Sequence, residues 1–206
     1  MNDTKPWKEK YNQGVRKEMS KRWEVRFGGF GGQGIVLSSV VLGLAAVYDD
    51  KYAAQRASYG SEARGGKCKS EVIISDEEIS YPLIDNLMNL VIMSQQAFDS
   101  YINELKPGGL LIIDPDMVDN IDKRDDVRVL RVPAANSADL LGNRIVANMV
   151  MLGALQAETN LVTINSLKKS VQNSVPERFI ELNLEAIDKG RKIVETHRND
   201  TTIGGS

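Results

Sequence analysis

The sequence predicts an α/β fold, a three-layer α/β/α domain with a Rossmann-like, mostly parallel sheet. Three observations support this prediction. Strand-like and helix-like segments alternate along the chain, the strand-like segments are continuously apolar, and a glycine-rich turn separates the first strand from the first helix. Continuously apolar strands are typical of parallel sheets that helices cover on both faces.

The expected strands are short segments, most of them apolar, and the one at 70–75 is rich in β-branched residues, which favour extended backbone. They span residues 22–27, 52–57, 70–75, 89–93, 110–113 and 127–132, with a short extended piece at 79–81. The longer segments between and after them have helical patterns. These expected helices span residues 35–47, 95–105, 143–156, 164–172 and 177–195.

We expect a single α/β domain over residues 23–197, because no linker or internal repeat divides the chain. A charged N-terminal arm at 1–22 precedes it, and a disordered tail at 198–206 follows it. The 206 residues are 42% hydrophobic, which is ordinary for a globular protein with one substantial core.

The composition argues against several classes of function. A net charge of -2 gives no field that would attract nucleic acid, and no apolar run reaches the roughly 20 residues that cross a bilayer. The one cysteine, Cys68, allows neither an internal disulfide nor, from this chain alone, an iron–sulfur cluster or a structural zinc. With a polar N-terminus, the sequence predicts a cytoplasmic protein that binds no metal and no membrane.

The first glycine loop follows the first expected strand and leads into the first expected helix. Gly29, Gly31 and Gly34 match the spacing of the dinucleotide-binding template, with Gly32 and Gln33 between them. Small residues let the backbone approach a ligand, and the free N–H groups of the helix start favour a phosphate. The alternative is that these glycines only allow close packing of the helix on the sheet.

A nicotinamide cofactor remains open as a second function. The template places an acidic residue at the end of the second strand to hold a ribose. Arg56 stands near that position instead, and a basic residue there suits a 2′-phosphate. The alternative function is therefore an NADP-binding, Rossmann-type reductase. The loop is not a Walker loop, because no Gly-Lys-Ser/Thr follows it.

A second glycine-bearing loop places a tyrosine, a carboxylate and a guanidinium between glycines. Its candidate binding residues are Ser58, Tyr59, Gly60, Glu62, Arg64, Gly65 and Gly66. A guanidinium can form a paired hydrogen bond with a carboxylate or a phosphate. The same side chains also suit contact with a partner chain. No nucleophile or general base accompanies the two loops, so we expect no catalytic residue in this chain.

The two loops together resemble the gamma subunit of 2-oxoacid:ferredoxin oxidoreductases. The similarity rests on residues 31–34, 58–60, 62 and 64–66, and it covers roughly residues 22–190. The loop form Gly-Phe-Gly-Gly-Gln-Gly at 29–34 and the segment 79–82 resemble gamma subunits that act on 2-oxoglutarate or branched-chain 2-oxoacids.

The resemblance implies an assembly with alpha, beta and delta (ferredoxin-like) subunits and with ferredoxin as electron acceptor. Such complexes decarboxylate a 2-oxoacid on thiamine diphosphate with Mg²⁺, pass electrons through iron–sulfur clusters, and release an acyl-CoA. The resemblance implies that the gamma subunit has no complete active site and binds none of these cofactors alone. The resemblance leaves open whether the two glycine loops hold coenzyme A or contact a neighbouring subunit.

Overall fold

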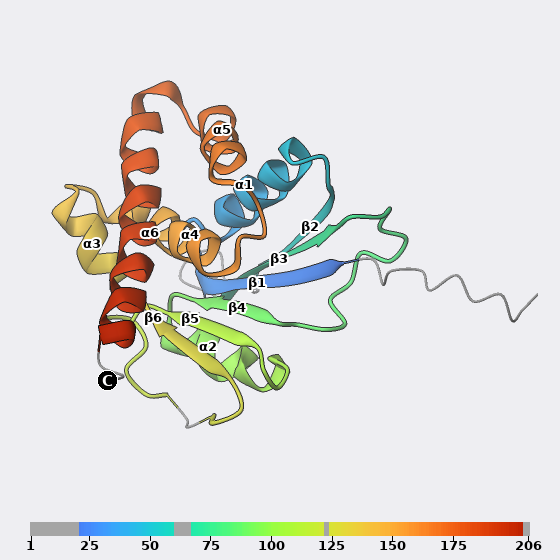
Figure 1. Cartoon of the computed structure of the whole chain (residues 1–206), viewed down its shortest axis with the longest axis horizontal. Coiled ribbons are helices and arrows are strands. Elements are labelled where there is room, and N and C mark those ends of the chain that lie inside the picture. Colours follow the sequence, from blue (N-terminus) through green and yellow to red (C-terminus); the bar gives the residue numbers. More distant parts are fainter. Residues whose placement is uncertain (1–20, 60–66, 122–123, 204–206) are drawn as a thin grey trace, which may run out of the picture.

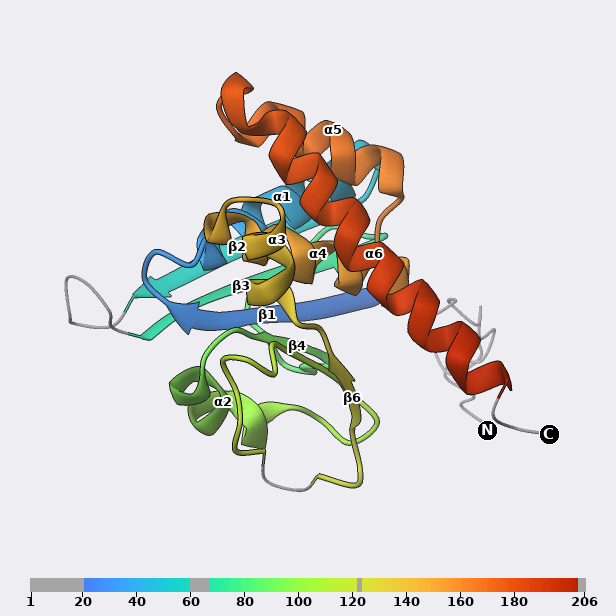
Figure 2. The same cartoon turned by 90° about the vertical axis from the view of Figure 1, so that its left-hand side faces the viewer.

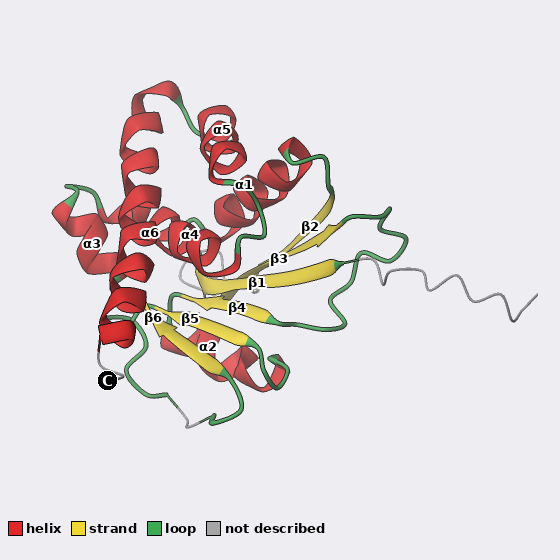
Figure 3. Cartoon of the chain, viewed as in Figure 1, coloured by secondary structure: helices red, strands yellow, loops and turns green. Residues whose placement is uncertain are grey.

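The computed structural model describes residues 21–59, 67–121 and 124–203. Within these ranges, six strands form one sheet in the order β2-β3-β1-β4-β5-β6 (Figures 1 and 3). The strands are β1 (Arg22–Phe30), β2 (Tyr52–Tyr59), β3 (Lys67–Ser75), β4 (Asn89–Ile92), β5 (Leu110–Ile113) and β6 (Arg128–Arg131). All the expected strands except the piece at 79–81 are thereby confirmed.

The sheet is mostly parallel, as predicted. β4 pairs in parallel with β1, β5 with β4, and β6 with β5. β3 is the exception, because it runs antiparallel to both β1 and β2. The connection at 60–66 is too short for the crossover that a parallel β2–β3 pair would need. β2 therefore runs in the same direction as β1, with β3 between them.

Helices lie on both faces of the sheet, in unequal numbers (Figures 1 and 2). The helices are α1 (Ile35–Tyr48), α2 (Gln95–Tyr101), α3 (Ala134–Leu140), α4 (Ala147–Thr159), α5 (Ile164–Ser174) and α6 (Ile180–Ile203). Short 3₁₀ turns, Ile102–Glu104, Arg144–Val146 and Glu177–Phe179, adjoin α2, α4 and α6. Of the described helices, α2 lies on one face and the others gather on the opposite face.

Two hydrophobic clusters match this division of the helices. The larger one joins Val25 and Phe27 of β1 to α1, α4, α5 and α6. The smaller one packs Phe98 of α2 against Leu90 and Leu111 of β4 and β5. Because β4 and β5 bury side chains on both faces, their apolar residues form continuous runs, and this is the pattern that the sequence displays.

Three elements differ from the expectation. α3 was not predicted, because its sequence of alanine, asparagine, serine and aspartate has no apolar stripe. The helix expected at 95–105 is α2 followed by a 3₁₀ turn. α6 continues to Ile203, into the segment expected to be a disordered tail, and Arg198 anchors it by donating to the Ala157 carbonyl at 3.0 Å. Residues 1–20 of the expected arm and residues 204–206 lie outside the described ranges.

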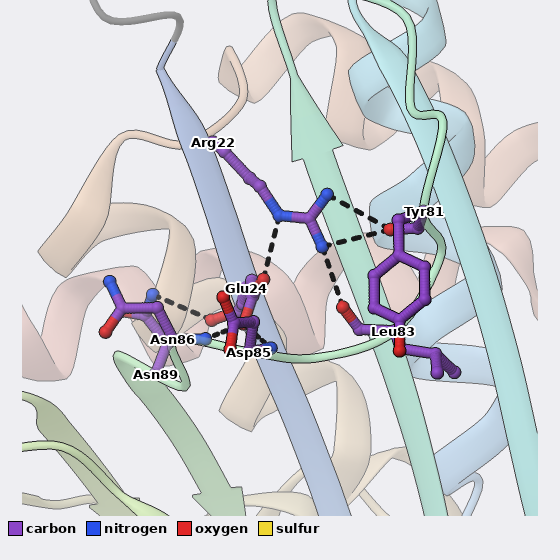
Figure 4. Close-up of polar contacts among 7 residues, drawn as sticks. All are labelled: Arg22, Glu24, Tyr81, Leu83, Asp85, Asn86 and Asn89. Atoms are coloured by element: carbon purple, nitrogen blue, oxygen red, sulfur yellow. Dashed lines mark hydrogen bonds and ion pairs between the residues drawn. The ribbon is translucent and has the colours of Figure 1, made fainter.

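The segment at 79–81 is not a strand, and a side chain of β1 bonds the backbone where this segment ends (Figure 4). The Arg22 guanidinium donates to the carbonyl oxygens of Tyr81 and Leu83, the shorter bond being 2.8 Å. Glu24, which is 2% exposed, accepts from the backbone N–H groups of Asp85 and Asn86 at 2.8 and 2.6 Å. β1 thus holds the connection between β3 and β4 by charged side chains.

Candidate functional site

The two glycine segments leave the sheet at the same end. The last residue of β1, Phe30, pairs with the first residue of β3, Lys67. The last residue of β2, Tyr59, pairs with Cys68 on the same strand. Among the predicted residues of the second loop, Ser58 and Tyr59 end β2. The others, Gly60, Glu62, Arg64, Gly65 and Gly66, lie outside the described residues.

Gln33 holds the first glycine loop in shape. Its Oε1 accepts from the backbone N–H of Phe30 at 2.6 Å, and its Nε2 donates to the Met93 carbonyl at 2.9 Å. Both ends of the side-chain amide therefore bond backbone groups of this chain. Gln33 ties the loop to the residue that follows β4, so its role within the described structure is to position the loop.

Two glycines of the loop are explained by close packing. A Cβ on Gly29 would lie 2.5 Å from Gln33 Oε1 and 2.7 Å from a methyl carbon of Ile35. A Cβ on Gly34 would collide with the side-chain amide of Asn148, which donates to the Gly34 carbonyl at 3.1 Å. Gly34 also has a φ of 72°, a conformation that side chains disfavour. Close packing thus accounts for the glycines at these two positions.

The outer part of the loop, Gly31 and Gly32, has no such explanation from packing. A Cβ built on either residue would meet no atom within 4 Å. Gly32 has a φ of 101°, which accounts for glycine there. Gly31 is not among the residues with positive φ, so neither its conformation nor its neighbours in the described structure require glycine. The open backbone at Gly31 is what a close-approaching ligand or partner would need.

The start of α1 adds hydrogen-bond donors beside this open backbone. Gly34 is the N-cap residue and offers no side chain, and the first turn of α1 contains no acidic residue. The N–H groups of the first turn of a helix have no partner within the helix and carry partial positive charge. The loop and the helix start together form an arrangement that suits an anion.

A cavity of about 210 Å³ opens beside the loop, at the carboxyl ends of β4 and β5. Its lining residues are Gly32, Gln33, Met93, Asp114, Met117, Ala135, Arg144, Ile145 and Ala147. The sheet extends from β1 through β3 and β2 on one side and through β4, β5 and β6 on the other. The cavity therefore lies where the order of strands reverses, which is the usual ligand position in open α/β sheets.

A second cavity of about 220 Å³ adjoins the first and shares Gly32 and Ile145 with it. Its apolar lining comes from α1 and from the connections before α4 and α6, and Asn143, Asn148 and Asn183 supply polar groups. The apolar lining residues are Leu37, Ile145, Val146, Val175, Pro176 and Phe179. Anion-favouring backbone and an apolar pocket thus meet at Gly32.

Asp114 is the buried carboxylate of the first cavity, with an exposed fraction of 0%. Its two oxygens accept from the backbone N–H groups of Ala135 at 2.7 Å and Asp116 at 3.1 Å. Burial raises the pKa of the Asp114 carboxyl above its usual value, and the two hydrogen bonds oppose that shift. Asp114 therefore attaches the start of α3 to the end of β5.

Sequence reasoning missed Arg144 and Asn148 as residues of this site. Arg144 lies at the rim of the first cavity and pairs with Asp139 at 3.0 Å. Asn148 contacts Gly34, 114 positions earlier in the chain. No spacing rule links residues so far apart, although a polar residue near the start of an otherwise apolar helix is a signal for Asn148.

The described residues contain no group of three or more histidine, cysteine, aspartate or glutamate side chains that could hold a metal ion. Burial raises the pKa of the Cys68 thiol, which disfavours the thiolate that ligation or nucleophilic attack would need. Among the helices of the described chain, none is long and apolar enough to cross a membrane.

Comparison with known proteins assigns the family. The family described as pyruvate ferredoxin/flavodoxin oxidoreductase matches residues 24–193. The 2-oxoglutarate synthase subunit KorC of Methanothermobacter marburgensis is 46% identical, over 84% of this chain and 97% of that protein. KorC of Methanocaldococcus jannaschii is 45% identical, over 87% and 98%.

Solved structures agree with the sequence comparison. A keto/oxoacid ferredoxin oxidoreductase gamma subunit from Geobacter sulfurreducens has a TM-score of 0.76 and 40% identity, over 84% of this chain and 99% of that one. A 2-oxoglutarate:ferredoxin oxidoreductase from Magnetococcus marinus has a TM-score of 0.78 at 24% identity, over 85% of this chain and 31% of that one, and supports the fold alone. The chain belongs to the pyruvate ferredoxin/flavodoxin oxidoreductase family.

Proposed function

We propose that this chain is the gamma subunit of a 2-oxoacid:ferredoxin oxidoreductase that acts on 2-oxoglutarate. The complex would decarboxylate the 2-oxoacid oxidatively, form an acyl-CoA and reduce ferredoxin. The observation that carries the proposal is the 46% identity to a 2-oxoglutarate synthase subunit over 97% of that subunit's length. At this identity and coverage the whole subunit, rather than one shared motif, is similar.

The fold argues against the alternative of an NADP-binding reductase. In the Rossmann arrangement the second strand lies beside the first and brings its last residues to the cofactor. Here β3 separates β2 from β1. In the strand register, Arg56 of β2 lies opposite Glu71 of β3, and Glu71 lies opposite Arg26 of β1. Arg56 is therefore separated from β1 by the whole of β3. With its pyrophosphate at the first glycine loop, NADP would find no basic residue of β2 beside β1 for its 2′-phosphate.

The remaining chemistry of the complex would belong to alpha, beta and delta subunits. We assign to them the thiamine diphosphate, the Mg²⁺ and the iron–sulfur clusters. The whole chain contains one cysteine, whereas an iron–sulfur cluster takes about four thiolate ligands. The gamma subunit then contributes structure and ligand contacts, without a catalytic residue of its own. A cytoplasmic location fits this assignment, because a ferredoxin acceptor is a soluble partner.

We further propose that the first glycine loop binds the phosphates of coenzyme A. Three features support this role: the open backbone at Gly31, the α1 start without a side-chain cap, and the adjoining cavities. The structure from Magnetococcus marinus is of an oxidoreductase with coenzyme A bound. The second loop, with Arg64, leaves the sheet at the same end and would supply a guanidinium to the same ligand.

Substitution of Gly31 tests this role, because a Cβ there would meet no atom within 4 Å in the described structure. Gly31→Asp would place a carboxylate near the phosphates and raise the KM for coenzyme A by about tenfold or more through charge repulsion. Gly31→Asn has nearly the same size without the charge and is the control. Arg64→Ala tests the second loop in the same assay. An unchanged KM in an intact complex for both Gly31→Asp and Arg64→Ala would refute a direct contact with coenzyme A.

A further inference from the structure

The face of the sheet opposite α1 carries a group of basic side chains on β1, β2 and β3, which we call the basic face. Its members are Arg26, Arg56, Lys67 and Lys69. The strand register places them together, because Arg26 and Arg56 are both paired with Glu71, and Lys67 and Lys69 lie on the same side of β3 as Glu71. Directly paired residues point to the same face of a sheet.

The two acidic residues that contact the basic face are already paired with its cations; Glu71 is buried, whereas the Glu104 side chain is 52% exposed. Glu71 Oε1 accepts from Arg26 Nε at 2.8 Å and lies 3.4 Å from Lys69 Nζ. Glu104 Oε2 pairs with Arg26 Nη1 at 2.7 Å. Arg26 is 3% exposed and Glu71 8%, so these groups form a fixed base under the surface.

Two cations of the basic face have no such partner. Arg56 and Lys67 are exposed, and neither forms an ion pair within the part of the chain that the structure describes. Lys69 lies 5.6 Å from the centroid of the Tyr101 ring, and Arg26 lies 5.2 Å from it on the same side of the sheet. The face therefore presents more positive than negative charge, and its two unpaired cations within the described ranges are Arg56 on β2 and Lys67 at the start of β3.

Within the described ranges, no helix covers the part of this face that β2 forms. α2 packs on β1, β3 and β4, whereas β2 has its main contacts with β3 and with α1 on the other face. In Figure 2, α2 lies below β4 and away from β2. β2 is also the last strand of the sheet, so one of its edges has unpaired backbone groups within the described structure. Mostly parallel sheets are ordinarily covered on both faces, and long open edges are ordinarily protected.

We propose that the basic face docks an acidic segment of another subunit of the same complex. Charge complementarity selects the occupant: an apolar helix would bury Arg56 and Lys67 without partners, at a large free-energy cost, whereas carboxylates would pair with them. The proposal rests on the proposed function, since it takes the chain to be one subunit of an assembly.

The test uses the complete complex with the double substitution Arg56→Gln and Lys67→Gln, which leaves the Arg26–Glu71–Glu104 contacts intact. At low salt, we expect the dissociation constant of the gamma subunit from the complex to be about ten times higher for this variant than for the parent. The difference should shrink as added salt screens the charges. Arg56→Lys with Lys67→Arg keeps both charges and should assemble like the parent. Lys106→Gln with Lys192→Gln, at exposed positions outside the basic face, is the matched neutralising control.

Unchanged assembly of the neutralised variant at every salt concentration would overturn the proposal. So would unchanged assembly with a raised KM for coenzyme A, because the face would then bind an anionic ligand instead of a protein segment. Activity of the parent complex with 2-oxoglutarate, coenzyme A and ferredoxin is measured first. Its absence would contradict the proposed function, whereas the assembly measurement addresses the basic face alone.

Discussion

At the scale of single residues, the glycine loop separates into positions that the fold requires and positions that it leaves open. Gly34→Ala would force a side chain into a φ of 72° and into the Asn148 amide. We expect a loss of about 2–4 kcal/mol in the free energy of unfolding. Gly31→Ala should change it by less than about 0.5 kcal/mol, because its Cβ meets nothing within 4 Å.

Urea unfolding of the two variants checks this difference. If Gly34→Ala were as stable as the parent, the contact between the start of α1 and Asn148 would be wrong. If Gly31→Ala were strongly destabilised, the outer part of the loop would not be open as the structure has it.

Two aspartates should give stability profiles of opposite sign against pH. Burial raises the pKa of Asp114 above 3.8, so its contribution to stability is present below pH 3.8 and is lost as the pH rises through the folded-state pKa. Burial also acts on Asp49, but hydrogen bonds from Ser166 and Thr163 outweigh it and lower the pKa below 3.8. Its contribution is present above pH 3.8 and is lost as the pH falls through the folded-state pKa.

Unfolding measured from about pH 2 to about pH 6 in the parent, Asp114→Asn and Asp49→Asn tests both signs. The advantage of the parent over Asp114→Asn should shrink as the pH rises, and its advantage over Asp49→Asn should shrink as the pH falls. Parallel profiles for the parent and either variant would show that the aspartate concerned does not titrate as its surroundings indicate.

At the scale of elements, the crossing of α4 and α6 depends on two glycines. A Cβ on Gly153 would collide with the Ile187 carbonyl, and a Cβ on Gly190 would collide with the Val150 carbonyl. Alanine is the better helix former by about 1 kcal/mol. We nevertheless expect Gly153→Ala to lower the free energy of unfolding by about 2–3 kcal/mol, because the two backbones would have to separate.

Thermal unfolding of Gly153→Ala and of Gly142→Ala distinguishes this contact from a general effect of glycine. Gly142 has a φ of 89° and open space around its Cβ position, so alanine there should cost only about 1–2 kcal/mol of backbone strain. A Gly153→Ala variant more stable than the parent would mean that α4 and α6 do not cross so closely.

The sequence predicted most of the elements and part of the site. Continuous apolar runs predicted β4 and β5, because a strand that is buried on both faces has apolar residues at every position. The antiparallel direction of β3 was not foreseen, since direction depends on the connection at 60–66 and not on the composition of the strand. α3 escaped detection because its start is fixed by Asp114, 21 positions earlier in the chain.

The site shows the same limit. The glycine-rich stretch correctly predicted a turn between a strand and a helix, but β1 continues to Phe30, so Gly29 belongs to the strand and the turn is 31–34. It gave no information on which glycines pack and which stay open. That division depends on the contacts of Gly34 with Asn148 and of Gly29 with Gln33. Both contacts are visible only in the folded structure. The role of the second loop stays a prediction, because residues 60–66 lie outside the described ranges.

At the scale of the whole molecule, the surface carries exposed apolar and basic regions that a partner subunit could cover. Ile145, which lines both cavities at the glycine loop, is 62% exposed, and Leu140 at the end of α3 is 75% exposed. The basic face lies on the other side of the sheet. Apolar side chains exposed near a ligand cavity are typical of sites that a partner covers. We therefore expect the site at the first glycine loop to be completed by a neighbouring subunit.

Purification of the protein in its native assembly tests the central claim most directly. We predict that the chain travels with subunits that contain thiamine diphosphate and iron–sulfur clusters, and that the assembly reduces ferredoxin only when 2-oxoglutarate and coenzyme A are both present. Recovery of the chain as a lone monomer that binds NADPH saturably would contradict the account.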